Sequence, residues 1–158
     1  MEPLFTYIDK ECDQEIWDID IDGYNEHTIK ILCSVYDGIS LKLREINVNP
    51  TISLVTSIML GVFGCVPAFN FCFYIWARNE FNSKRAFTEF DSESLKMLSS
   101  FYQYNKDAFD SIDLRVMVGA KWSGDKSLIG NDLYPKAKLL DMYGYSKGWS
   151  YLQKRQIV

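Results

Sequence analysis

Charged residues are missing from one long stretch of this sequence. Between Glu45 and Arg78 there is no Asp, Glu, Lys or Arg for 32 residues, although 24% of the 158-residue chain is charged. About 20 apolar residues suffice for a membrane-spanning helix. However, Pro67 would break a helix interior, and Asn70 would lack a polar partner in lipid. We therefore predict two buried strands, near 51–62 and 68–77; the alternative is a membrane anchor over 51–77.

Histidine is almost absent, and cysteines in a Cys-x-x-Cys spacing are absent altogether. One histidine, His27, excludes a histidine-based metal cluster, and any Ser-His-Asp or Cys-His nucleophilic site would have to use it. We expect the four cysteines to be reduced structural thiols: Cys12, Cys33, Cys65 and Cys72. The first residues lack the basic-then-apolar order of a signal peptide, which favours a cytoplasmic location.

Alternating hydrophobicity predicts strands in the first half of the chain, over 17–23, 29–35 and 39–44. Asp37-Gly38 fits the two-residue turn of a hairpin between the last two. Further strands at 51–62, 68–77 and 85–90 would extend this meander, with a weaker one at 114–118. Helices are expected over 3–14, after Asp91-Ser92-Glu93, and from Pro135 to Gly144. The predicted fold is a single α+β domain over residues 1–158, with an antiparallel sheet of about six strands covered by two or three helices.

Charge is distributed unevenly along the sequence. The net charge is −4, but residues 1–45 contain eleven acids and four bases, whereas residues 78–158 contain ten acids and thirteen bases. An acidic first half disfavours nucleic acid as the ligand, because binding to phosphate needs Lys and Arg. It favours a basic protein partner, since complementary charge speeds association and selects partners.

Three aspartates alternate with apolar residues at the start of the predicted meander: Asp18, Asp20 and Asp22. This spacing resembles the opening of an EF-hand loop, but Asn25 and Ile29 stand where that loop needs an apolar residue and a bidentate Glu. Three interpretations remain: a solvated strand face, a recognition face for a basic protein, and a divalent-metal site.

A second near-match to a motif lies at 119–127, where glycines and a lysine suggest a phosphate-binding loop. That loop requires adjacent Gly and Lys, but Asp125 separates Gly124 from Lys126 and would repel an anion. A surface turn at 123–126 is the preferred interpretation.

The sequence contains no catalytic constellation, so we hypothesise a non-enzymatic protein-binding module without a cofactor. It would act as an inhibitor or immunity-type protein, or as a viral antagonist, on a basic toxin or host protein. The predicted binding residues are Asp18, Asp20, Asp22 and Glu26. One alternative is a membrane-anchored accessory subunit with its anchor at 51–77. Another is a metal-dependent enzyme that uses Asp18, Asp20 and Asp22.

Overall fold

Helices make up most of the structure, a computed structural model that describes residues 2–83, 87–112, 115–117 and 129–155. The main helices are α1 (Glu2–Thr6), α2 (Glu26–Glu45), α3 (Ile52–Val62), α4 (Phe71–Glu80), α5 (Ser92–Tyr104), α6 (Lys106–Asp110) and α7 (Lys136–Arg155). Between α1 and α2 lie a π-helical turn and two 3₁₀ turns: η1 (Tyr7–Glu11), η2 (Gln14–Asp18) and η3 (Ile21–Gly23). Two short strands, β1 (Arg115–Met117) and β2 (Ile129–Leu133), precede α7.

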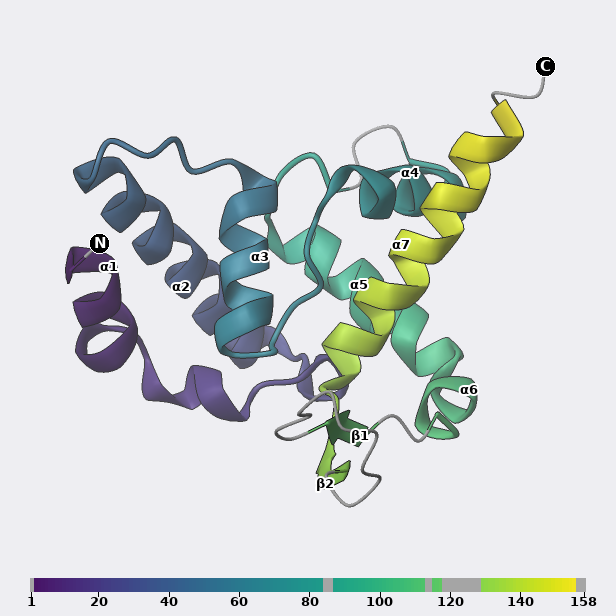
Figure 1. Cartoon of the computed structure of the whole chain (residues 1–158), viewed down its shortest axis with the longest axis horizontal. Helices are drawn as coiled ribbons and strands as arrows, with labels where there is room; N and C mark the ends of the chain where they lie inside the picture. Colours follow the sequence, from purple (N-terminus) through teal and green to yellow (C-terminus); the bar gives the residue numbers. More distant parts are fainter. Residues whose placement is uncertain (1, 84–86, 113–114, 118–128, 156–158) are drawn as a thin grey trace, which may run out of the picture.

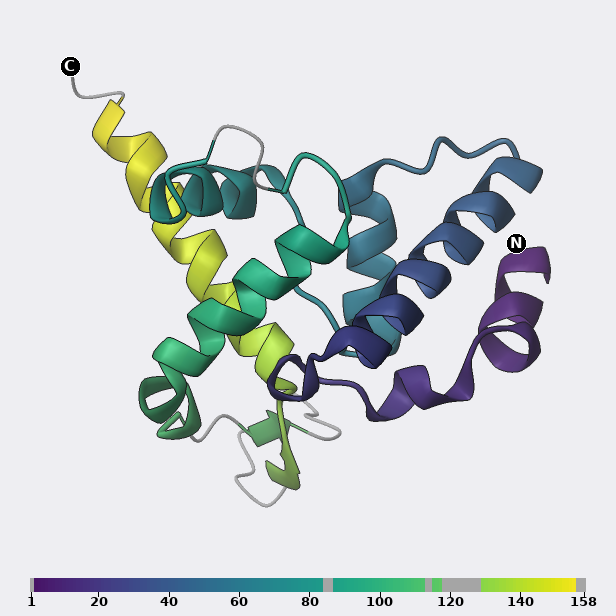
Figure 2. The same ribbon diagram turned by 180° about the vertical axis from the view of Figure 1, so that it is seen from behind.

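The helices are arranged from one end of the molecule to the other. Figure 1 shows α1 and α2 at the end that carries the N-terminus, α3 in the middle, and α4 and α7 at the end that carries the C-terminus. Helix α5 lies behind α7 in that view and in front of it in Figure 2. The β1–β2 pair lies close to the first turn of α7 (Figure 1).

The predicted α+β fold with an antiparallel sheet of about six strands is wrong. Within the described ranges the strands are β1 and β2, one antiparallel pair that aligns Arg115 with Leu133 and Met117 with Ile129. β1 falls within the weak strand expected at 114–118. Residues 87–90 form no strand, and the turn expected at 123–126 lies outside the described residues.

The predicted hairpin over 29–44 is part of the 20-residue helix α2. Its buried positions include Leu32, Val35, Ile39 and Leu43, which follow helical spacing and not alternation. Gly38 lies inside this helix, and a Cβ atom at that position would overlap the ring of Tyr7. The glycine therefore permits close packing of the N-terminal segment on α2, and the chain makes no turn there.

The two predicted buried strands are the helices α3 and α4. In α3 the buried residues are Val55, Thr56 and Met59, which lie on one helical face. Both helices begin at a polar cap: Thr51 accepts a hydrogen bond from the Leu54 amide, and Asn70 from the Phe73 amide. In a segment where nearly every residue is apolar, a two-residue and a 3.6-residue period both fit, so periodicity alone misassigned them.

A membrane anchor over 51–77 would need one continuous helix, but a non-helical connection separates α3 from α4. Three of its main-chain groups are bound by distant side chains: the Cys65 carbonyl accepts from Tyr24 (2.6 Å), the Phe69 amide donates to Thr56 (2.9 Å), and the Ala68 amide donates to Asp141 (3.1 Å). No helix in the described part of the chain combines the length and apolar character that crossing a membrane requires.

Helix α7 packs against α4 through two glycines. A Cβ atom at Gly144 would lie 2.6 Å from the Phe73 ring and 2.8 Å from the Trp76 ring, and one at Gly148 would overlap the main chain of Cys72. The predicted end of this helix at Gly144 is therefore wrong, because α7 continues to Arg155. The predicted start is confirmed, since the helix begins directly after Pro135.

An aromatic cluster fills the space between α4, α5 and α7. Trp76 is fully buried and lies 5.0 Å from Phe73, 5.1 Å from Phe101 and 5.8 Å from Tyr143, measured between ring centroids. All three pairs are edge-to-face, a geometry that adds to the stability gained by burial. Phe73 and Trp76 of the uncharged stretch thus form core contacts from a helix.

Candidate functional site

The predicted strand over 17–23 is wrong, because these residues form the end of η2, a two-residue link and the whole of η3. Asp13 accepts a hydrogen bond from the Glu15 amide at the start of η2 (3.0 Å), and Asp20 accepts one from the Ile21 amide at the start of η3 (2.7 Å). Ile19 and Ile21 are buried, whereas 47% of Trp17 is exposed. Trp17 therefore does not share a face with the two isoleucines, as the strand interpretation required.

Asp20 fixes the first turn of α7. Its two carboxylate oxygens accept hydrogen bonds from the main-chain amides of Lys136 (2.6 Å) and Ala137 (2.8 Å). These amides have no partner within the helix itself, and a negative charge suits this end of the helix dipole. Burial raises the pKa of Asp20, and its hydrogen bonds to main-chain amides oppose that rise. Asp20 is thus a cap that joins the N-terminal segment to a helix 116 residues later.

Asp22 belongs to a chain of paired side chains. It binds the ammonium group of Lys136, which lies 3.9 Å from a carboxylate oxygen of Asp110. The same Asp110 oxygen accepts a hydrogen bond from the Tyr102 hydroxyl (2.6 Å). The hydrogen bond to Asp22 raises the pKa of Lys136, and the one from Tyr102 lowers the pKa of Asp110. The lysine charge is therefore balanced by two carboxylates from distant parts of the chain.

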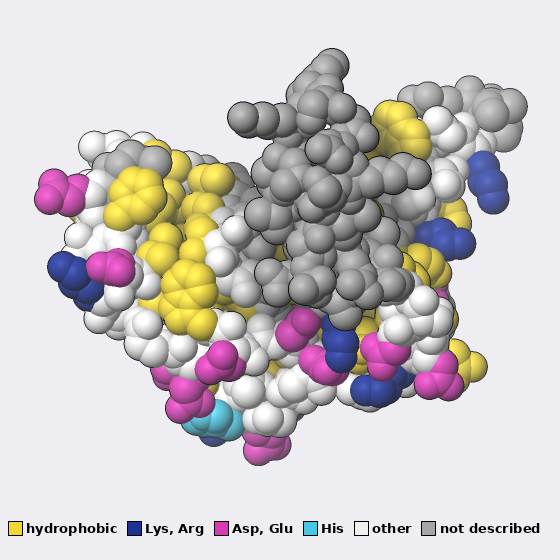
Figure 3. Space-filling view, turned by 60° about the horizontal axis from the view of Figure 1, so that its bottom comes forward, with side chains coloured by type: hydrophobic (Ala, Val, Ile, Leu, Met, Phe, Trp, Pro, Cys, Tyr) yellow, Lys and Arg dark blue, Asp and Glu magenta, His cyan; other side chains and the backbone are white. Residues whose placement is uncertain are grey.

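The side chains of Asp18 and Glu26 are exposed and make no hydrogen bond or ion pair with the described residues. They belong to the acidic segment, residues 9–26, in which eight Asp and Glu residues accompany one base, Lys10. Figure 3 shows acidic side chains gathered along one edge of the molecule, beside its histidine. The structure thus separates the four predicted binding residues into two exposed carboxylates and two that bind groups within the chain.

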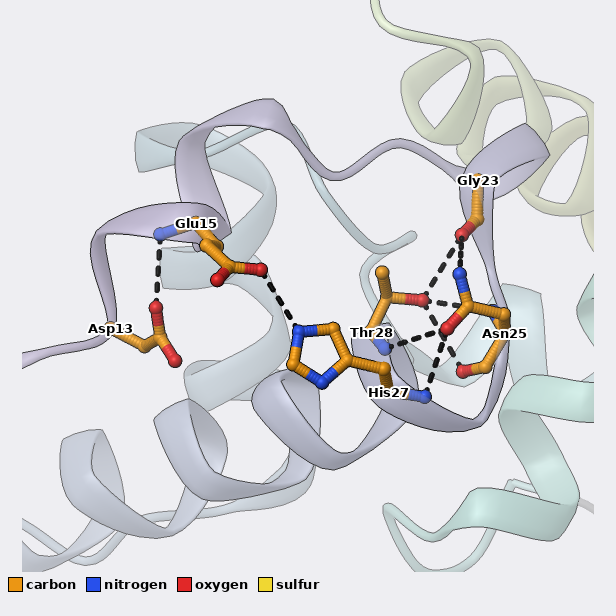
Figure 4. Close-up of polar contacts among 6 residues, drawn as sticks. All are labelled: Asp13, Glu15, Gly23, Asn25, His27 and Thr28. Atoms are coloured by element: carbon orange, nitrogen blue, oxygen red, sulfur yellow. Dashed lines mark hydrogen bonds and ion pairs between the residues drawn. The ribbon is translucent and has the colours of Figure 1, made fainter.

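His27 connects the acidic segment to the first turn of α2 (Figure 4). Its Nε2 atom lies 3.0 Å from a Glu15 carboxylate oxygen, and both side chains are about two-thirds exposed. Asn25 caps the helix by accepting from the amides of His27 and Thr28, and the Thr28 hydroxyl accepts from the Asn25 amide. Among the described residues, the His27 ring pairs with the Glu15 carboxylate, and no Ser or Cys side chain is hydrogen-bonded to it.

A pocket of about 450 Å³ opens beside the acidic segment. We call it the Trp17 pocket, and its lining includes Trp17, Asp18, Phe63, Asp110, Tyr134 and Lys136. The Trp17 ring meets Phe63 edge-to-face with 4.7 Å between centroids, and Phe63 is buried. After Phe63 the chain turns at Gly64, whose φ of +69° favours glycine and whose missing side chain leaves room for Pro135. The end of α3 and the start of α7 therefore share one wall of the pocket.

The three aspartates do not form a cluster of metal ligands in the described structure. Across the ranges 2–83, 87–112, 115–117 and 129–155, no three His, Cys, Asp or Glu side chains come together as metal ligands. The oxygens of Asp20 accept main-chain hydrogen bonds, and Asp22 binds Lys136. The four cysteines are free thiols, three of them buried and Cys33 half-buried.

No protein-family model, curated protein or solved structure matches this chain. A function can therefore be argued only from its own residues. The sequence pointed to the acidic segment, but it did not identify Trp17 as exposed or Lys136 and Asp110 as neighbours of Asp22. The position of Trp17, directly before an aspartate in the most acidic part of the chain, is a sequence feature that could have indicated its exposure. No local pattern links Asp22 to side chains 88 and 114 residues away.

Proposed function

We propose that this chain is a non-enzymatic protein-binding module that uses its acidic segment to bind a basic partner protein. An inhibitor or immunity-type protein, or a viral antagonist of a host protein, would work in this way. The observation that carries the proposal is the pair of exposed carboxylates, Asp18 and Glu26, which have no partner among the described residues and lie on the same segment as the half-exposed Trp17. Tryptophan is enriched among residues that dominate binding energy, and charge around it steers the partner.

In this proposal Asp18 and Glu26 meet the partner, which is supported by their lack of a partner among the described residues. Asp20 instead holds the start of α7, and Asp22 holds Lys136. In this proposal Asp20 shapes the surface and Asp22 contributes charge at its edge. The encounter would occur in the cytoplasm, where thiols such as the four free cysteines stay reduced.

The test uses the whole chain immobilised on a surface to capture partners at low salt. Each captured protein is then purified, and its association rate is measured as salt increases. Wild type is compared with the double variant Asp18→Asn plus Glu26→Gln, which removes two charges and breaks no hydrogen bond or ion pair among the described residues. We expect association with a basic partner to slow about twofold to fivefold in the variant and to slow with added salt, because both weaken electrostatic steering.

A matched control removes two charges elsewhere. Glu80→Gln plus Glu93→Gln changes two exposed carboxylates on α4 and α5 and gives the same net charge. This control should leave the association rate close to that of wild type. The proposal is refuted if association does not depend on salt, or if both double variants slow it equally.

A further inference from the structure

The Trp17 pocket has walls of aromatic rings and an excess of carboxylates. Its volume of about 450 Å³ lies within the range of about 300–1,000 Å³ that is usual for ligand sites. Among the described lining residues, three contribute carboxylates, Asp18, Asp20 and Asp110, and one contributes an ammonium group, Lys136. A pocket with this lining favours a cationic group over an anionic or neutral one.

The charged groups of the pocket differ in whether they already have a partner within the chain. Asp20 is occupied by the amides of α7, and Asp110 by Tyr102 and Lys136. Lys136 is in turn neutralised by Asp22 and Asp110, so it presents little repulsion to a second cation. Asp18 is the carboxylate in this lining whose oxygens make no hydrogen bond or ion pair with a described residue.

The aromatic side of the pocket is also open to a ligand. Trp17 contacts Phe63 on one side, and 47% of its surface is exposed. Tyr134 is 37% exposed. A flat guanidinium group stacks on aromatic rings and pairs with a carboxylate through two parallel hydrogen bonds. An ammonium group can pair with the carboxylate but does not stack, so this combination of groups favours arginine over lysine.

We propose that the Trp17 pocket receives an arginine side chain of the basic partner, with the guanidinium group against Trp17 and paired with Asp18. This inference rests on the proposed function and specifies which residue of the partner is recognised. A neighbouring cavity, which shares Phe63 and Tyr134, lacks this selectivity. Its charged groups, Lys138 and Asp141, are paired with each other at 2.9 Å, and Asp141 also binds the Ala68 amide.

The probe for this inference is N-acetyl-arginine methylamide, titrated into the whole chain while the indole NMR signals are followed. Its lysine counterpart tests the preference for guanidinium, and its citrulline counterpart keeps the shape of arginine without the charge. We expect the Trp17 signal to shift with the arginine compound, about fivefold weaker binding of the lysine compound, and no saturable shift with citrulline.

Two variants locate the probe within the molecule. Trp17→Ala and Asp18→Asn should each weaken arginine binding about fivefold, and Trp17→Phe should retain part of it because a ring remains. Trp149→Ala is the matched control, since Trp149 is 50% exposed on α7 and lies outside the pocket lining. Circular dichroism of each variant checks that the helices are intact.

Equal binding of all three compounds, or unchanged binding in Trp17→Ala, would overturn the arginine assignment. This failure is distinguishable from failure of the proposed function. If the probe does not bind but partner association still slows in Asp18→Asn plus Glu26→Gln, the pocket assignment is wrong and the acidic recognition surface stands. If the partner is also insensitive to that double variant and to salt, both proposals are wrong.

Discussion

Replacing Asp20 with alanine removes the cap of α7 while leaving the surrounding apolar residues in place. The main-chain amides of Lys136 and Ala137 lose their acceptor, and so does the amide of Ile21. The loss of a helix cap costs about 0.5–2 kcal/mol, and a single hydrogen bond to a charged group contributes about 1.5–3 kcal/mol. The substitution should therefore be among the more damaging ones on this surface.

One opposing effect reduces that cost. Burial raises the pKa of Asp20, which shows that keeping the ionised carboxylate in this position carries a desolvation penalty. Alanine removes that penalty together with the hydrogen bonds. We expect Asp20→Ala to lower the free energy of unfolding by about 2–3 kcal/mol, and Asp20→Asn by about 1 kcal/mol because asparagine still caps helices.

Urea and thermal unfolding, followed by circular dichroism, measure the effect. A loss of about 2–3 kcal/mol corresponds to a fall in Tm of about 4–12 °C for a chain of this size. Asp18→Ala is the control, since this exposed carboxylate has no partner among the described residues, and its effect should stay within about 0.5 kcal/mol. Equal stability of Asp20→Ala and Asp18→Ala would refute the capping role.

Two further predictions concern the helix contacts and the alkaline range. Gly148→Ala forces a Cβ atom into the Cys72 main chain and should lower the free energy of unfolding by about 1–3 kcal/mol. Gly61→Ala, whose Cβ atom would have nothing within 4 Å, should raise the free energy of unfolding by about 0.5–1 kcal/mol. Urea unfolding that ranks the two variants otherwise would contradict the α4–α7 packing. Burial and the bond to Asp110 raise the pKa of Tyr102 to about 12, from 10.0. The folded state therefore keeps this proton longer than the unfolded state, so stability falls as pH rises from about 10 to about 12. Tyr102→Phe should make the free energy of unfolding, measured with urea, fall less between pH about 10 and about 12. An unchanged dependence on pH would argue against the raised pKa of Tyr102.

Sequence patterns were sufficient where a cap and a helical stripe agreed. Asp91 accepts a hydrogen bond from the Ser94 amide (2.7 Å), and Leu95, Leu98 and Tyr102 are buried along α5, as predicted. The helix expected over 3–14 appears in part, as α1 followed by η1. In these segments, local hydrogen bonding and burial favour the same structure, so no distant contact was needed to decide it.

Periodicity failed where almost all residues were apolar or where two periods overlapped. Asn25, Thr51 and Asn70 cap helices in the structure, whereas the alternation beside them predicted strands. Gly38 and Gly144 were interpreted as a turn and a helix end. Both lie inside helices, because a glycine that permits close packing has the same sequence signature as one that permits a turn.

The sequence by itself determined the uneven charge, the acidic segment, the isolated histidine and the free thiols, since these depend on composition and short spacing. Only the tertiary structure decided which carboxylates remain available. Asp20 and Asp22 are bound by α7 because folding brings residues 114–117 positions apart into hydrogen-bond range. Asp18 has no such partner in the described part of the chain and lines the pocket with Trp17. Contacts of that separation leave no periodic trace in the sequence, because they depend on how helices pack and not on local backbone preference.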